Sequence, residues 1–184
     1  MKADIMKRIS ITAWAALAIA ACLYATMTLW TLPAISRTAG GLPPFDMRPG
    51  GYTFGEAKAF LSALSENGRA LYLGPQQHLD LVFPAALALG LGLALYRLAP
   101  FTRFWKLCFA AIPVIGMAFD YLENAAVRAM LLAGPAILQP EQVETASRLT
   151  IAKSVFGSAG YGLVLVFLVL WAVRRRRGAS ASHV

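Results

Sequence analysis

The sequence predicts an all-α membrane protein, a bundle of four transmembrane helices with a partly helical extracytoplasmic loop between the first and second. Of its 184 residues, 58% are hydrophobic and 14% are charged, whereas soluble domains are about 45–50% apolar and about 25% charged. Four apolar stretches approach or exceed the length that crosses a hydrocarbon core about 30 Å thick. Lysine and arginine gather at alternating ends of these stretches. Together these observations argue against a soluble domain, a disordered chain and a disulfide-stapled secreted module.

The first span is expected at about residues 9–33. Its apolar core, Ile11–Leu32, has 22 residues and would form about 33 Å of helix. Lys7-Arg8 before this run makes the segment resemble a signal peptide, and residues 19–22 resemble a lipobox, whose processing would leave an acylated Cys22 at the N-terminus. Because the apolar run continues well beyond Cys22, we favour an uncleaved helix.

The outer loop is expected over residues 36–79, long enough to carry structure of its own. Thr53 is followed three positions later by Glu56, which is the pattern of a capping box. Apolar residues then recur at helical spacing, so we expect a short amphipathic helix from Thr53 to about Glu66. This helix would lie on the bilayer surface or cap the bundle, with a moving lid as the alternative. Asn67-Gly68 would end it, and Leu71–Leu73 would be a short extended segment.

Three further spans follow the outer loop. The second, about residues 80–97, has a short apolar run of about 24 Å, so Arg97 would snorkel or the bilayer would thin. The third is expected at about 106–132 and is interrupted by charged residues. The fourth, about 150–173, contains the single charge of Lys153. Residues 1–177 would thus form one integral membrane domain, and 178–184 a disordered cytoplasmic tail.

The net charge of +8 is interpreted as a topology signal. Ten of the seventeen basic residues precede the first span, separate the second from the third or follow the fourth. The positive-inside rule then places both termini in the cytoplasm, and the high alanine and arginine content favours the bacterial inner membrane. We expect no nucleic-acid binding, although the arginine run could also contact anionic lipid head groups. The ten are Lys2, Lys7, Arg8, Arg97, Arg103, Lys106 and Arg174–Arg177.

Metal and cofactor chemistry finds little support in the sequence. Cys22 and Cys108 both lie in apolar spans without a Cys-x-x-Cys pair, and the two histidines are His78 and His183. A disulfide enzyme needs exposed cysteine pairs, and a zinc site needs several converging ligands. We therefore expect no cofactor and no metal.

Five charged residues lie near the outer ends of the spans. Counted along the helix from Lys106, Asp120 lies about 21 Å and Glu123 about 26 Å into the membrane. An unpaired charge at that depth costs roughly 2.5–3.5 kcal/mol on insertion scales, so the charged sides should face one another. We expect Lys153 to pair with Asp120 or Glu123. The five are Asp80, Asp120, Glu123, Arg128 and Lys153.

The role of this cluster is open among three hypotheses: an ion-pair network that sets helix register, a site for a lipid head group or partner helix, or an enzymatic site. In the enzymatic reading, crowded carboxyl groups would act as acid and base in lipid isomerisation or hydrolysis. The catalytic candidates are Asp120, Glu123, Asp80 and Lys153. The binding candidates are Asp80, Asp120, Glu123, Asn124, Arg128, Lys153, Arg69 and Tyr72.

Several short motifs resemble those of small bacterial four-span membrane proteins of unknown function. The motifs are Asp46-Met47-Arg48 with Gly51-Tyr52, Gly68–Tyr72, Leu79-Asp80 with Phe83-Pro84, Phe119–Asn124 and Lys153. This resemblance covers about residues 45–155 and implies the architecture alone. The span count and buried acids are also reminiscent of the sterol-isomerase-like (EXPERA) membrane domains, an analogy that informs only the enzymatic alternative.

Overall fold

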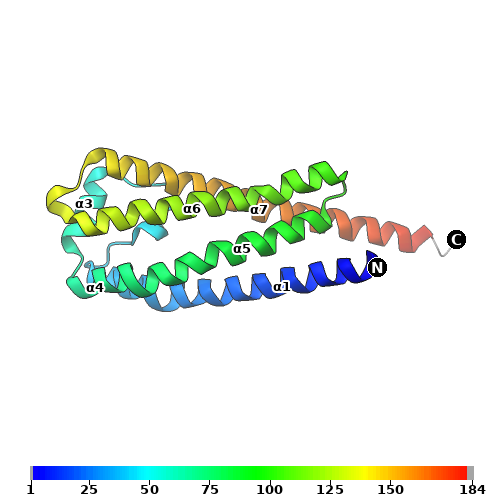
Figure 1. Cartoon of the computed structure of the whole chain (residues 1–184), viewed down its shortest axis with the longest axis horizontal. Coiled ribbons are helices and arrows are strands. Elements are labelled where there is room, and N and C mark those ends of the chain that lie inside the picture. The colour runs from blue at the N-terminus through cyan, green and yellow to red at the C-terminus, as the bar shows by residue number, and fades with distance from the viewer. Residues whose placement is uncertain (1, 182–184) are drawn as a thin grey trace.

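Helices account for almost all of the computed structural model, which describes residues 2–181, with side chains from 4 to 176. No strand occurs within that part of the chain. Figure 1 shows long helical rods that run side by side, with both ends of the chain at the same end of the bundle. The elements are α1 (Lys2–Thr26), η1 (Met27–Thr31), α2 (Leu32–Thr38), η2 (Phe45–Met47), α3 (Phe54–Ala63), α4 (Glu66–Leu71), η3 (Tyr72–Gln76), α5 (Gln77–Leu98), α6 (Arg103–Ile137) and α7 (Pro140–Ala181).

Four helical segments are long and apolar enough to cross a membrane, which confirms the predicted four-helix bundle. They are Asp4–Thr38, Glu66–Leu98, Arg103–Ile137 and Pro140–Arg176. Each is longer than the apolar run that predicted it. The second helical segment has 33 residues and is longer than the expected span of 80–97, because polar residues continue the helix before Asp80. α7 extends to Ala181, and residues 182–184 of the expected tail lie outside the described residues.

Two short π-helical segments widen the first and second spans at the same level. They are η1 and η3, which contact one another. Pro33 follows the first and Pro75 lies in the second; proline has no N–H to donate, so the regular hydrogen-bond ladder is interrupted there. Between the two segments the buried Thr31 hydroxyl donates to Gln76 Oε1 at 2.5 Å. Neither polar group is therefore left unpaired in the interior.

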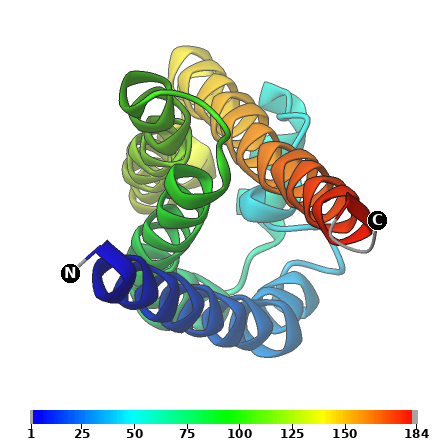
Figure 2. The same ribbon diagram turned by 90° about the vertical axis from the view of Figure 1, so that its right-hand side faces the viewer.

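The rods pack in sequence: α1 along α5, α5 along α6, and α6 along α7, with α5 also touching α7. The face that α1 turns to α5 consists of small buried residues, Ala13, Ala16 and Ala20, and small residues let membrane helices approach closely. Gly90 of α5 lies against Leu17 with no room for a Cβ atom. α1 and α7 do not pack along one another, and Figure 2 shows them on opposite sides of α5.

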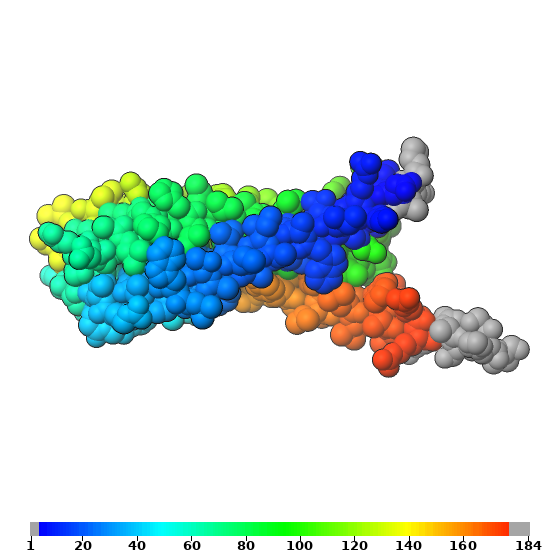
Figure 3. Space-filling view, turned by 90° about the horizontal axis from the view of Figure 1, so that it is seen from below, coloured from blue at the N-terminus to red at the C-terminus, as the bar shows by residue number. Residues whose placement is uncertain are grey.

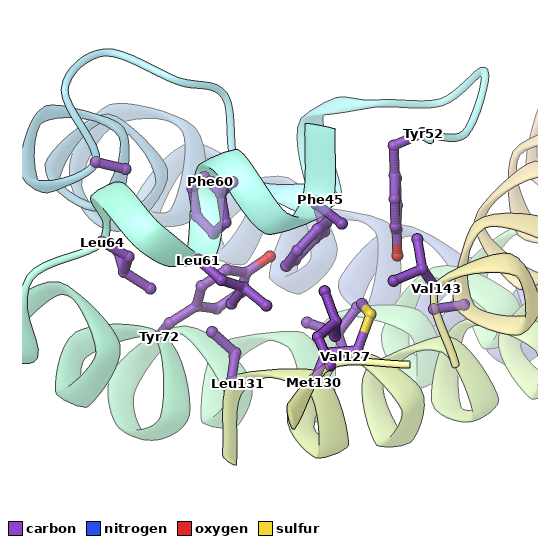
Figure 4. Close-up of a cluster of buried hydrophobic side chains, with 14 of the residues drawn as sticks. Phe45, Tyr52, Phe60, Leu61, Leu64, Tyr72, Val127, Met130, Leu131 and Val143 are labelled. Atoms are coloured by element: carbon purple, nitrogen blue, oxygen red, sulfur yellow. The ribbon is translucent and has the colours of Figure 1, made fainter. Parts of the chain in front are cut away.

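The outer loop caps the bundle by packing against α6 and α7. Figure 4 shows its aromatic side chains stacked over α6, where they meet Val127, Met130 and Leu131. The Phe45 ring centre lies 4.7 Å from that of Tyr52 and 5.0 Å from that of Phe60. Offset and edge-to-face aromatic contacts of this kind stabilise a core. The aromatic core comprises Phe45, Tyr52, Phe60 and Tyr72.

The predicted loop helix is present as α3, and its capping box is confirmed. Thr53 N–H donates to Glu56 Oε2 at 2.7 Å, and Glu56 N–H donates to Thr53 Oγ1 at 3.3 Å. α3 ends at Ala63, so its expected end at Glu66 was slightly late.

Two expectations for the following segment were wrong. Asn67-Gly68 lies inside α4 instead of ending a helix, because the Ser65 side chain caps a new helix by accepting from Gly68 N–H at 3.2 Å. Gly68 also packs against Thr38, where a Cβ atom has no room. Leu71–Leu73 is helical, not extended, because the chain continues through η3 into α5.

Candidate functional site

Lys153 of α7 joins the charged side chains toward the end of the bundle that lies opposite the chain termini. Its ammonium group forms an ion pair with Glu123 and lies 3.6 Å from Asp120 Oδ1. The side chains of Lys153 and Asp120 are 16% and 14% exposed, and that of Glu123 is fully buried. The expected pairing of Lys153 is therefore present with both carboxylates.

Glu123 is engaged through both carboxylate oxygens. Lys153 meets Oε2, and the buried Thr150 hydroxyl donates to Oε1 at 2.6 Å. Thr150 lies one helical turn before Lys153 on α7, so both side chains face α6. A buried carboxylate is tolerated when it is paired and hydrogen-bonded, and this arrangement fixes α6 against α7.

A fourth carboxyl group, that of Asp46, enters the cluster from the outer loop. It belongs to η2, and its Oδ2 accepts a hydrogen bond from the buried Tyr72 hydroxyl. It is also a neighbour of the carboxyl group of Asp80 on α5. Asp46 is not among the site residues that the sequence predicts, because a loop residue has no periodicity that would direct it into the bundle. Its presence in a short aromatic-flanked motif, next to Phe45, was the available signal.

Tyr52 directs an unpartnered hydroxyl at the same cluster. The residue is 7% exposed, and its backbone N–H is held by Ser147 Oγ at 2.8 Å. The hydroxyl faces Thr150 and Glu123 but makes no hydrogen bond of normal geometry within the described part of the chain. Burial, followed by the nearby Glu123 carboxylate, raises the pKa of Tyr52 well above its ordinary value. Tyr52 is therefore a neutral donor that faces a negative group.

The cluster holds more negative than positive groups. Four carboxyl groups, those of Asp46, Asp80, Asp120 and Glu123, surround the single ammonium group of Lys153. Carboxyl groups held this close are stable when they share protons or face additional cations. Chemically, the cluster could thus hold a cation, hold a proton or act as an acid and base pair. No group of described residues has the geometry of a metal site.

Arg128 lies outside the cluster, although it was expected within it. Its Nη1 donates to Gln77 Oε1 at 2.8 Å on the exposed side of α5 and α6. Asp120 instead contacts Lys153 of α7, so the two side chains of α6 meet different neighbouring helices. Arg69, another binding candidate, lies over the backbone of Gly134, where α6 is kinked.

Asn124 connects the cluster to a surface pocket. Its side-chain amide donates to the Asp80 backbone carbonyl at 3.3 Å and to Asp120 Oδ1 at 3.4 Å. On its other side it lines a pocket of about 290 Å³ between α5 and α6. Two of the lining residues, Asn124 and Arg128, are among the binding candidates that the sequence predicts. The other lining residues have no sequence pattern that distinguishes them from ordinary surface residues of a helix. The pocket is lined by Leu73, Gln77, His78, Leu81, Tyr121, Asn124, Ala125 and Arg128.

Comparisons with protein-family models, with curated proteins and with solved structures found nothing that matches this chain.

Proposed function

We propose that the chain is a membrane protein that binds the phosphate-bearing head group of a lipid in the pocket between α5 and α6. The observation that supports this function is the composition of that pocket. Arg128 and His78 supply the donors that a phosphate oxygen needs, and Asn124 and Tyr121 add uncharged polar groups. Apolar Leu73 of η3 and Leu81 of α5 complete the pocket wall on either side of these polar groups.

The acidic cluster has a structural role in this proposal. Its ion pairs hold α6 against α7, and Asp80 and Asp120 orient the Asn124 amide that forms the pocket wall. A binding group held by a second layer of hydrogen bonds is preorganised, so little freedom is lost when the ligand arrives. The cluster thus sets the shape of the pocket without touching the ligand itself.

The charge distribution supports a location in a bacterial inner membrane with both termini in the cytoplasm. The termini share one end of the bundle, where the basic residues gather (Figure 1). The pocket at the opposite end then faces the outer leaflet and meets lipid head groups there. The partners of the protein are the bilayer and this lipid; a partner helix is the alternative occupant.

Native mass spectrometry of the purified full chain with phosphatidylglycerol tests this function. Arg128→Gln removes the pocket cation while leaving the buried cluster intact, and we expect affinity to fall about tenfold, the loss of one charge-assisted hydrogen bond. Arg148→Gln is the matched control, because Arg148 pairs with Glu144 on the exposed side of α7, away from the pocket. Equal lipid retention by the two variants would contradict the proposal.

A lipid-modifying enzyme is the second candidate, and a specific observation favours it. Asp46 is a neighbour both of the Asp80 carboxyl group and of the Tyr52 hydroxyl, which has no hydrogen-bond partner among the described residues, a combination suited to proton transfer. For such an enzyme, membranes with the wild-type chain would contain a lipid product that the Asp80→Asn variant does not form. Identical lipid profiles would leave the binding function as the better reading.

A further inference from the structure

A second pocket lies at the other end of the bundle, near the termini. It has a volume of about 330 Å³ and is bounded by α1, α5 and α7, within the roughly 300–1,000 Å³ typical of small-molecule sites. Its walls are mainly apolar, formed by Trp14, Leu17, Leu93, Leu168 and Trp171. Figure 3 shows the corresponding hollow, where α1 and α7 diverge toward the chain ends.

The pocket is a consequence of how the helices pack. The small-residue face of α1 is used against α5, and α7 packs mainly on α6. α5 therefore forms the bottom of the gap between α1 and α7, and the gap is open on the side away from α5. Its rim carries the exposed rings of Trp14 and Trp171. Tryptophan concentrates where lipid head groups meet hydrocarbon, so the rim is placed at a membrane interface.

Two cations lie at the mouth of this pocket. Arg97 lines it and donates one hydrogen bond, from Nη1 to the Ser10 hydroxyl. A guanidinium group has five N–H donors, so most remain available. The Arg175 guanidinium lies 5.3 Å from the centre of the Trp171 ring, which is part of the pocket wall. The mouth is thus positive and the interior apolar.

We propose that this pocket holds an anionic phospholipid, with an acyl chain along Leu17 and Leu93 and the phosphate against Arg97. Basic pockets between membrane helices recognise anionic head groups in this way. A partner helix fits less well, because close helix contacts use small residues and this rim carries bulky tryptophan and leucine. This site is separate from the outer pocket of the proposed function and does not depend on it.

The test is a competition in nanodiscs that contain phosphatidylcholine with increasing phosphatidylglycerol, read as lipid retained by the full-length chain in native mass spectrometry. Arg97→Gln should lower the preference for phosphatidylglycerol about fivefold, as expected for one basic residue at an anionic surface. Arg103→Gln is the matched control, since Arg103 is exposed and does not line the pocket; it should keep the wild-type preference.

A second variant separates the acyl-chain part of the site from the charge. Ala94→Phe places a ring in the pocket and should reduce retention of both lipids while the melting temperature stays near that of the wild type. Unchanged preference in Arg97→Gln, or an equal loss in Arg103→Gln, would overturn the proposal. A second copy of the chain released by Ala94→Phe would also overturn it, because the occupant would then be protein. Loss of binding in Arg128→Gln alone would concern only the outer pocket.

Discussion

Glu123 shows how a single residue can organise this protein. Its side chain is fully buried in a helix, and it is stable there because Lys153 forms an ion pair with one oxygen and the Thr150 hydroxyl donates a hydrogen bond to the other. The pairing with Lys153 was predictable, because a helix repeats every 3.6 residues and a membrane charge needs a partner. The approach of Asp46 and Tyr52 was not predictable, because the path of a loop depends on the surface onto which it folds.

At the same scale, we predict that Lys153→Met destabilises the protein much more than Lys58→Met. Loss of Lys153 leaves Glu123 and Asp120 without their cation, and breaking a buried pair costs roughly 3–5 kcal/mol. Lys58 lies on the exposed side of α3, over the ring of Phe54, and should cost less than about 0.5 kcal/mol. Thermal unfolding of the two variants in the same detergent measures the difference; equal midpoints would argue against a stabilising pair.

Among the elements, the outer loop contains one feature that neighbouring residues determine and one that depends on contacts between distant segments. The capping box of α3 is local: Thr53 and Glu56 are three residues apart and bond each other's backbone, so the sequence predicts it correctly. The expected helix end at Asn67-Gly68 failed for a tertiary reason. Ser65 caps a new helix there, and its backbone N–H donates to the Thr38 carbonyl at 3.1 Å, across the loop. No pattern of neighbouring residues contains that contact.

The stability of α3 should depend on pH through Glu56, the acidic residue of its capping box. Hydrogen bonds from the Thr53 backbone and hydroxyl lower the pKa of Glu56 below its ordinary value. A depressed acid contributes stability above its unfolded pKa, about 4.3, and loses it as the pH falls through the lower folded pKa. The protection of the α3 amides against hydrogen exchange should therefore fall as the pH drops below about 4.3, and it should fall more in the wild type than in Glu56→Gln. A parallel response in both proteins would show that the cap is not the sensor.

On the scale of the whole molecule, the first and last of the four long helices leave a gap between them. α1 and α7 both border α5 but do not pack along one another, which creates the second pocket, the one lined by Trp14, Arg97 and Trp171. Hydropathy alone could not predict which helices leave a gap between them, because α1 and α7 are both apolar enough to pack on a neighbouring helix. The shape of the contact faces decides: small residues on α1 fit α5, and bulky residues remain at the rim.

The orientation of the chain across the membrane is also a property of the whole molecule. With both termini at one end of the bundle and the basic residues concentrated there, we predict that a cytoplasmic reporter fused at either terminus is active and a periplasmic one is not. A reporter inserted in the exposed turn at Gly50 should give the opposite result. Opposite activities at the two termini would contradict an even number of spans.

The sequence by itself determined the number of spans, the pairing of Lys153 with buried acids and the cap of α3, because hydropathy, helical period and capping act over a few neighbouring residues. Only the tertiary structure decided that Asp46 and Tyr52 lie in the acidic cluster. It also decided that Arg128 lines the pocket between α5 and α6 instead of joining that cluster, and that a second pocket lies between α1 and α7. Each of these depends on which surfaces meet. Packing between segments distant in the chain is settled by shape and charge complementarity in three dimensions.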